Sequence, residues 1–394
     1  MKRILSLMLT LCMVLSVASF AVAEDVVTLK VWGPQEEQVI LGEMVEAFKA
    51  ANPDTTFDIT LAVVSEADAK TKYLEDPQAA ADVFAFADDQ LLELVATESL
   101  YEVIVNADQV KANNSAGAVA ASTVDGTMYA YPMTADNGYF MYYDKSVLSE
   151  EDVLSFNKML DVADAAGKKV FMDVSNGWYI ASFFLGAGCT LTLNEDKTQN
   201  CDFNGPMGLN AGEGIKAIVD HPAFITGDDS VLTGGMGDNI VAGVSGTWNA
   251  NAIQEKLGDN YGATKLPAFL CGGEDKQMGS FAGFKLMGIN AYSQFPEQAQ
   301  MLADFLTNEE NQVKRFEARG MGPSNINAAQ SEAVLSNVAL SALAQQSPFS
   351  TSQQYVNNNT YWGPAEAFGL ALETGSTEGM QELLDAMTAQ ITAK

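Results

Sequence analysis

The sequence predicts an α/β protein, and three observations carry that prediction. Short strand-like stretches are separated by segments whose apolar residues recur at helical spacing. Strands and helices alternate along the chain instead of forming separate blocks, which is typical of a sheet with parallel strands. The chain has 394 residues, 47% of them hydrophobic, so it is long and apolar enough for a sizeable core. A chain of this length ordinarily forms two or three domains of about 100–200 residues each.

The alternation is clearest at the start of the chain. The apolar run 27–32 predicts a strand, and the apolar spacing across 40–48 predicts a helix that ends at Asn52-Pro53. Strict alternation over 57–63 predicts a second strand. The apolar run 82–87 predicts a third strand, buried on both faces. Further strands are expected at 128–132, 139–143, 169–174, 240–244 and 262–269, and further helices at 296–319, 331–345 and 379–392.

The charge balance excludes whole classes of partner. With 21 Lys and Arg against 51 Asp and Glu, the net charge is −30, which repels nucleic acids and anionic membrane surfaces. The one histidine, His221, rules out His-rich metal sites and leaves a single base for a nucleophilic triad. Gly234–Gly237 is glycine-rich but lacks the Lys-Ser/Thr of a phosphate-binding loop. We therefore expect no nucleic-acid partner, no metal and no other cofactor.

Residues 1–23 have the features of a signal peptide. Lys2 and Arg3 precede the apolar run 4–17, and Ala21-Val22-Ala23 matches a cleavage site. We expect an exported protein, either periplasmic or at the cell surface and extracellular. Leu11 stands before Cys12 where a lipid anchor needs a small residue, so Cys12 is interpreted as part of the removed segment.

Cys189 and Cys201 flank a segment that predicts a β-hairpin. Leu191 and Leu193 alternate with threonines, and Asn194-Glu195-Asp196 has turn chemistry. A bridge across the hairpin is compatible with an oxidising compartment. We expect a possible Cys189–Cys201 disulfide and a free Cys271; the alternative is that all are ordinary thiols.

Three of the four tryptophans stand in polar, glycine-rich surroundings that do not suit a core. These are Trp178, Trp248 and Trp362, whereas Trp32 follows an apolar strand and is expected in the core. A sugar ring has an apolar C–H face and a rim of hydroxyls, so it needs an aromatic plate and polar groups around it. The alternative is that each indole packs a loop onto its own domain.

Several segments in order resemble one protein family. They are 29–32, 81–89, 125–133, 244–248 and 287–293. Together they resemble the maltose/maltodextrin-binding proteins, the exported solute-binding components of ABC sugar importers. The resemblance spans essentially the whole chain after the signal segment.

The resemblance implies a two-lobed, type II periplasmic-binding-protein-like fold, with crossing strands between the lobes and a ligand cleft. The implied lobes are 25–134 with 285–325, and 135–284 with 326–394. The implied function is capture of maltose or maltodextrin-type α-glucans and delivery to the membrane permease subunits of an ABC importer. Such a protein is expected to be a monomer and not an enzyme.

The resemblance also implies site residues. Its aromatic platforms correspond to Phe86, Trp178, Trp248 and Trp362, and its polar sugar contacts to Asp89, Asp136, Asn176 and Glu366, with Glu36 and Glu37 nearby. The sequence departs from the family in places: Phe86 stands where well-known members have Trp, and Gln90 replaces an Arg. The sugar linkage and the preferred chain length therefore stay open.

Two alternatives remain. The same fold could bind another oligosaccharide or a cationic polyamine, because carboxylates interleaved with indoles also suit a cation. A different class would be a secreted glycosidase that uses two carboxylates. Aromatic plates in separate segments favour a ligand of several rings.

Overall fold

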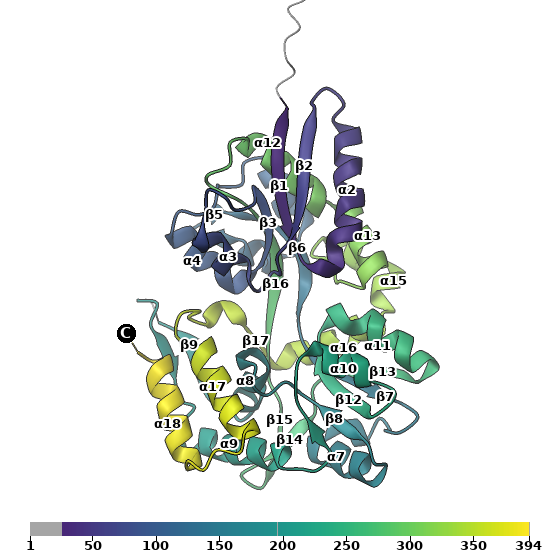
Figure 1. Ribbon diagram of the computed structural model, residues 1–394, viewed down its shortest axis with the longest axis vertical. Helices are drawn as coiled ribbons and strands as arrows, with labels where there is room; N and C mark the ends of the chain where they lie inside the picture. Colours follow the sequence, from purple (N-terminus) through teal and green to yellow (C-terminus); the bar gives the residue numbers. More distant parts are fainter. Residues whose placement is uncertain (1–25, 195, 394) are drawn as a thin grey trace, which may run out of the picture.

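Two β-sheets organise the protein, which is described here from a computed structural model covering residues 26–194 and 196–393 (Figure 1). We call the part around the first, six-stranded sheet the upper lobe and the part around the five-stranded sheet the lower lobe. The upper sheet has the order β17 (Ser350–Ser352), β16 (Ser280–Ile289), β3 (Val83–Ala87), β1 (Val27–Gly33), β2 (Phe57–Val63), and β6 (Ala130–Gly138) also pairs with β16. The lower sheet has the order β11 (Phe224–Ile225), β8 (Lys169–Phe171), β12 (Ile240–Ser245), β7 (Phe140–Asp144), β13 (Tyr261–Thr264).

Helices surround both sheets, and three short hairpins complete the fold. The upper lobe contains α2 (Gln38–Ala51), α3 (Ala69–Glu75), α4 (Leu91–Ala96), α5 (Ala107–Asn113), α6 (Ala116–Ala121), α12 (Pro296–Thr307) and α13 (Glu309–Arg319). The lower lobe contains α7 (Phe156–Ala165), α8 (Gly177–Gly186), α9 (Pro206–Val219), α10 (Asp229–Gly235), α11 (Ala250–Leu257), α17 (Trp362–Glu373) and α18 (Met380–Ile391). After α13 the chain forms α14 (Ile326–Ala329), α15 (Glu332–Leu335) and α16 (Val338–Gln346). The hairpins are β4 (Thr123–Val124) with β5 (Thr127–Met128), β9 (Leu191–Leu193) with β10 (Gln199–Cys201), and β14 (Ala268–Cys271) with β15 (Glu274–Gln277).

The predicted α/β class is confirmed, and three predicted elements are interrupted. The helix expected over 296–319 divides at Asn308, whose extended backbone begins α13 while its side chain accepts a hydrogen bond from the Asn311 amide. Asn337 likewise caps α16 and separates it from α15. Short polar side chains favour such caps over a continuing helix. The strand expected over 262–269 divides into β13 and β14 around Pro267, since proline has no N–H for the ladder.

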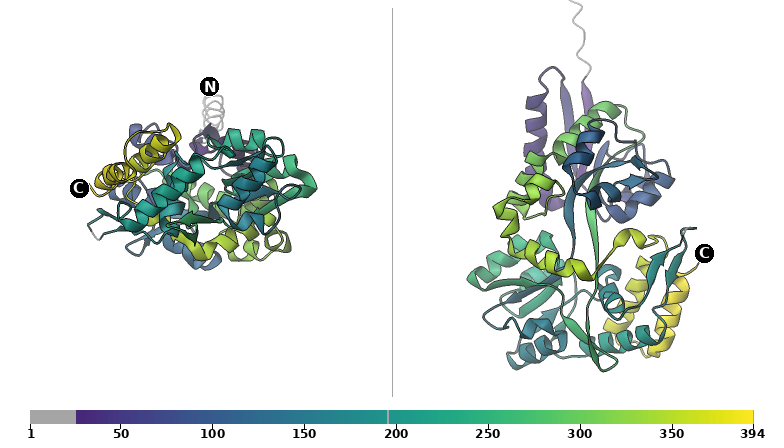
Figure 2. Two further views of the ribbon diagram at one scale, coloured as in Figure 1. Left: turned by 90° about the horizontal axis from the view of Figure 1, so that it is seen from below. Right: turned by 180° about the vertical axis from the view of Figure 1, so that it is seen from behind.

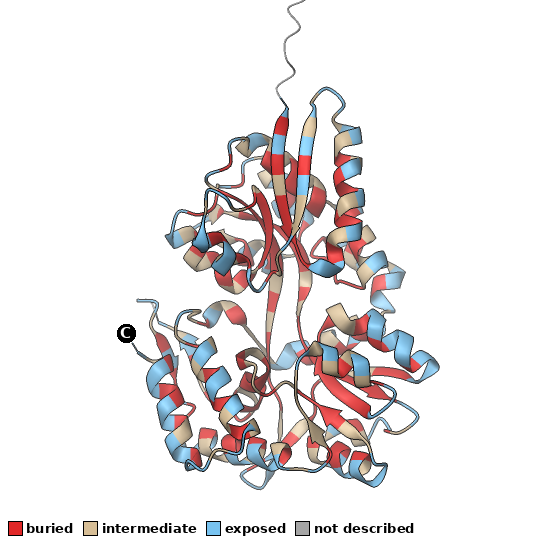
Figure 3. Cartoon of the chain, viewed as in Figure 1, coloured by how far each residue is buried: buried red, intermediate tan, exposed pale blue. Residues whose placement is uncertain are grey.

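Each lobe has its own hydrophobic core, centred on the sheet strands (Figure 3). Trp32 lies in the upper core, as expected, and is 8% exposed. The upper core also encloses a complete ion pair: Arg315 Nε lies 3.0 Å from Glu37 Oε1, and both side chains are buried. Removing one partner of such a pair would leave an uncompensated buried charge.

Strands β6 and β16 pass between the lobes and are paired with each other over most of their length (Figure 2). Their antiparallel register runs from Ala282 opposite Gly138 to Gly288 opposite Ala130. The register shifts on both sides of Lys285, so the ladder is irregular at this one residue. The two strands therefore place residues of both lobes on one continuous hydrogen-bonded element.

The predicted signal peptide, 1–23, lies outside the described residues. None of the described helices has the length and apolar composition that a membrane crossing requires.

The hairpin predicted between the cysteines is present, but the expected disulfide is not. Cys189, Cys201 and Cys271 are buried free thiols within the described part of the chain. In the β9–β10 register Cys201 lies opposite Leu191, so Cys189 is a diagonal neighbour and not the facing residue. Diagonal pairs stand about 7–8 Å apart, beyond the usual reach of a disulfide.

We predict that a chain lacking its first 25 residues exposes three thiols to Ellman's reagent after denaturation without reductant. In native buffer these thiols should react slowly, because burial raises the pKa of Cys189 and of Cys201 to about 12 and the thiolate is the nucleophile. Finding one thiol instead of three would restore the disulfide.

Candidate ligand-binding site

In the upper lobe, polar residues follow the carboxyl ends of three parallel strands. β1 pairs with β2 and β3 in parallel, so all three strands end at the same edge of the sheet. The segments that follow them are Pro34–Glu37, 65–68 and Asp88–Gln90. In open α/β sheets such an edge is where ligands bind.

The lower lobe presents the same kind of edge. β8 is parallel to β11 and to β12. Asn176 and Trp178 follow β8, Asp229 follows β11 as the first residue of α10, and Trp248 follows β12. The two sheets therefore direct their carboxyl ends toward a common space.

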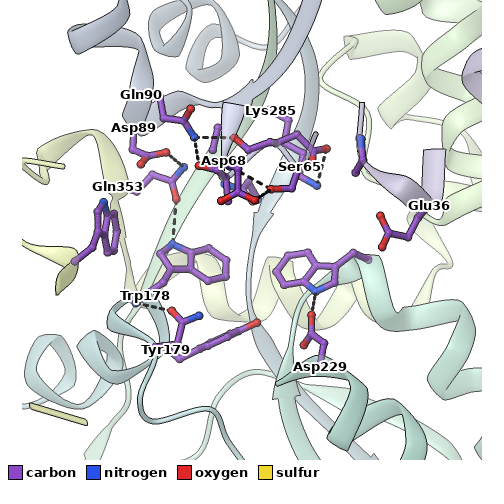
Figure 4. Close-up of a pocket in the computed structure, with 18 of the residues that line it drawn as sticks. Glu36, Ser65, Asp68, Asp89, Gln90, Trp178, Tyr179, Asp229, Lys285 and Gln353 are labelled. Atoms are coloured by element: carbon purple, nitrogen blue, oxygen red, sulfur yellow. Dashed lines mark hydrogen bonds and ion pairs between the residues drawn. The ribbon is translucent and has the colours of Figure 1, made fainter. Parts of the chain in front are cut away.

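A cavity of about 730 Å³ occupies this space (Figure 4). Its volume lies in the range of small-molecule sites, about 300–1,000 Å³. Seven of the ten residues expected at the site line it: Glu36, Asp89, Asn176, Trp178, Trp248, Trp362 and Glu366.

All three tryptophans of the cavity have their indole N–H tied to a neighbouring side chain. Trp178 Nε1 donates to Gln353 Oε1 at 3.0 Å and Trp248 Nε1 to Asp229 Oδ2 at 2.9 Å. Trp362 Nε1 donates to Asn358 Oδ1 at 2.9 Å. Each ring is half-buried and held at its polar edge, so what it offers to the cavity is apolar ring surface.

Glycine makes room for Trp248. A β-carbon on Gly246 would lie 1.9 Å from the Trp248 ring, so only glycine permits the backbone to approach the indole this closely. The indole centroids of Trp178 and Trp248 are 5.9 Å apart. These two rings thus form adjacent aromatic surfaces on the lower lobe.

Three of the expected site residues lie outside the cavity, and these expectations need correction. Phe86 is fully buried and packs against Phe84, because every residue of β3 up to it points into one or the other face of the core. Glu37 is held by Arg315. Asp136 is 1% exposed and accepts hydrogen bonds from the Thr247 hydroxyl and the Gly322 amide.

Further residues line the cavity that the sequence pattern did not indicate as site residues. They are, among others, Ser65, Glu66, Asp68, Gln90, Tyr179, Asp229, Lys285, Arg319 and Gln353. A signal existed for Ser65, Glu66 and Asp68, since they are polar residues that come just after the predicted strand 57–63. Lys285 and Gln353 carry no such signal; they reach the cavity only because β16 crosses between the lobes and pairs with β17.

A buried pair of aspartates stands at the upper wall. Burial, reinforced by the charge of Asp89, raises the pKa of Asp88 to about 8, and burial raises the pKa of Asp89 to about 7. Gln353 Nε2 donates to Asp88 Oδ1 at 2.5 Å and to Asp89 Oδ1 at 3.3 Å. Because Gln353 Oε1 also accepts from Trp178, one amide connects the acidic pair to an indole of the lower lobe.

The cavity is chemically suited to binding a polyhydroxylated molecule. Indole surfaces lie on one side, and carboxylates, amides and two cations, Lys285 and Arg319, provide acceptors and donors. Among the described residues no group of three metal-ligating side chains gathers.

The two lobes and the polar, tryptophan-lined cavity between them define a solute-binding protein. The chain belongs to the family of bacterial extracellular solute-binding proteins, whose sequence model matches residues 43–342. This is a family of binding proteins and not an enzyme family.

Solved structures and a curated relative resemble most of the chain. A protein solved with acarbose is 34% identical with a TM-score of 0.85, covering 93% of this chain and 98% of that one. The maltodextrin-binding protein of L. casei BL23, solved without ligand, is 26% identical with a TM-score of 0.78 over 93% and 99% of the two chains. The galactooligosaccharide-binding protein of Bacillus subtilis (strain 168) is 27% identical over 86% of each chain. The expected two-lobed fold is thereby confirmed.

We predict that Asp88→Asn reduces the loss of stability at rising pH. The pKa of Asp88 rises on folding from 3.8 to about 8, so the folded state holds more protons than the unfolded state between these values. Stability therefore falls as pH rises through this window, and asparagine removes this contribution. Between pH 5.5 and 8, the free energy of unfolding measured with urea should fall by at least about 1 kcal/mol less in the variant than in the parent. The exposed control Asp164→Asn should follow the parent; an unchanged slope for Asp88→Asn would contradict the assignment.

Proposed function

We propose that this protein captures maltose or maltodextrin-type α-glucan oligosaccharides in the interlobe cavity and delivers them to an ABC importer. The observation that carries the proposal is the set of three edge-anchored indoles in one cavity with carboxylates and amides around them. An indole whose N–H is already bonded stacks on the apolar face of a sugar without competing for its hydroxyls.

The spacing of the aromatic rings supports a ligand with more than one sugar unit. Trp178 and Trp248 are neighbours, whereas Trp362 enters from α17 and packs against Phe281. The cavity volume also suits an oligosaccharide better than a single hexose. Binding requires no bond to break, so we propose a carrier without catalytic activity.

The relatives support an oligosaccharide ligand, but different sugars are named for them. One resembling protein is a maltodextrin-binding protein and another was solved with acarbose. The Bacillus subtilis relative is a galactooligosaccharide-binding protein, so galactooligosaccharides are the second candidate.

We propose export through the signal segment 1–23, action as a monomer, and docking to the permease subunits of an importer. The proposed lobe boundaries are 25–134 with 285–325, and 135–284 with 326–394.

A thermal-shift and calorimetry panel tests the ligand. It contains maltotriose, maltotetraose, a galactooligosaccharide, acarbose and spermidine. A ligand at one hundred times its dissociation constant adds about 2.7 kcal/mol of stability. Stabilisation by maltotriose or maltotetraose supports the proposal; stabilisation by the galactooligosaccharide or by spermidine alone would replace it. Glucose released from maltotriose would indicate a glycosidase.

We predict that Trp248→Ala and Trp362→Ala bind maltotriose at least about fivefold more weakly, because truncating an aromatic hot spot costs about 1–3 kcal/mol. Calorimetry measures the affinity, and both variants should melt within a few degrees of the parent.

The matched control is Trp32→Ala, a core substitution that should cost about 3–5 kcal/mol of folding stability. If Trp248→Ala and Trp362→Ala instead lower the melting temperature strongly and leave affinity unchanged, these indoles only pack the fold.

A further inference from the structure

Lys285 is the one charged residue on the crossing strand β16. It lies opposite Ala87 of β3 and Thr134 of β6, and the β6 register shifts on both sides of it. Irregularities of this kind are common beside functional sites because they re-aim a side chain. The Lys285 side chain lines the cavity, although the residue is only 8% exposed (Figure 4).

The surroundings keep this side chain positively charged. Burial lowers the pKa of Lys285, but the carboxylates of Glu66, Asp136 and Glu37 outweigh it and the net shift is upward. Lys285 is therefore an ammonium group with three N–H donors at neutral pH.

The ion pair with Glu66 leaves these donors incompletely used. Nζ lies 3.3 Å from Glu66 Oε1, longer than the 2.7–2.9 Å that is typical of a charge-assisted hydrogen bond. Within the described part of the chain, Glu66 Oε1 has no hydrogen-bond donor. Glu66 thus balances the charge of Lys285 through one long contact.

The ammonium also faces the lower lobe. Nζ lies 5.7 Å from the ring centroid of Trp248, within the range of a cation–π contact. A sugar ring stacked on Trp248 would place hydroxyl oxygens next to this nitrogen, and hydroxyls are acceptors that the buried ammonium needs.

We propose that Lys285 is a ligand-orienting residue: its ammonium group donates hydrogen bonds to hydroxyls of the sugar ring that stacks on Trp248. This inference rests on the proposed function. Because Lys285 contacts Glu66 of the upper lobe and Trp248 of the lower lobe, the ring it orients is bound by both lobes at once.

The test separates sugar binding from charge balance. Removing Lys285 alone would leave Glu66 buried and unpaired, so Glu66→Gln serves as the reference background. In calorimetry with maltotriose, Lys285→Met/Glu66→Gln should bind at least about tenfold more weakly than Glu66→Gln, the range expected for a lost hydrogen bond from a charged group. Equal affinity of the two variants would overturn the inference and reduce Lys285 to a partner of Glu66.

Lys265→Met is the matched control. Lys265 also has a cation–π contact, 5.2 Å from Phe349, but it does not line the cavity, so its removal should leave affinity within about twofold. If the double variant does not fold, Lys285→Arg replaces it. Arginine keeps the charge but substitutes a planar fork for the ammonium, and unchanged affinity in that variant would count against the inference. If the unmodified protein binds no sugar in the panel, the proposed function fails first and this inference with it.

Discussion

The antiparallel pairing of β6 and β16 is the constraint on which the rest of the structure depends. Side chains at alternate positions of a strand share a face, and along β16 three such positions meet the site. Phe281 packs against Trp362, and Lys285 reaches Glu66 and Trp248. Between them, a β-carbon on Gly283 would overlap the Asp88 carboxylate and the Gln353 amide, so only glycine fits there. One strand therefore sets the relative positions of an aromatic plate, an acidic pair and a cation.

Buried polar groups beside these strands connect the lobes through hydrogen bonds, which fix the orientation of the groups that they join. Asp136 on β6 accepts from Thr247 at 2.6 Å, and Thr247 precedes the indole of Trp248. Gln353 connects Asp88 to Trp178 in the same way. Hydrogen bonds of this kind contribute modestly to net stability but are costly to leave unmade. The positions of both indoles are consequently coupled to residues outside the lower-lobe sheet.

The sequence predicts the alternating α/β architecture because strand and helix periodicities are local properties. It also predicts Trp178 and Trp248 at the cavity, since glycine and asparagine neighbours mark them as unsuited to a core. It does not separate Phe86 from those platforms: an aromatic ring at the end of a strand faces either the ligand or the core, and that choice depends on packing across the sheet. The position of Gln353 at the site cannot be predicted for a related reason, because only the pairing of β17 with β16 brings its segment there.

Charge in the cavity bears on the kind of ligand more than the overall net charge does. The chain carries a formal charge of −30, yet burial raises the pKa of Asp88 to about 8 and of Asp89 to about 7. Near neutral pH burial therefore favours the protonated form of Asp88, and a protonated carboxyl group both donates and accepts hydrogen bonds. Asp89 lines the cavity, and so does Lys285, which adds a positive charge there. A polyamine would benefit from fully ionised carboxylates and would be repelled by Lys285, whereas neutral hydroxyls can use every one of these groups. These groups suit the hydroxyls of an uncharged sugar, whereas a cation would depend on the other carboxylates that line the cavity, Glu36, Glu66, Asp68, Asp229 and Glu366.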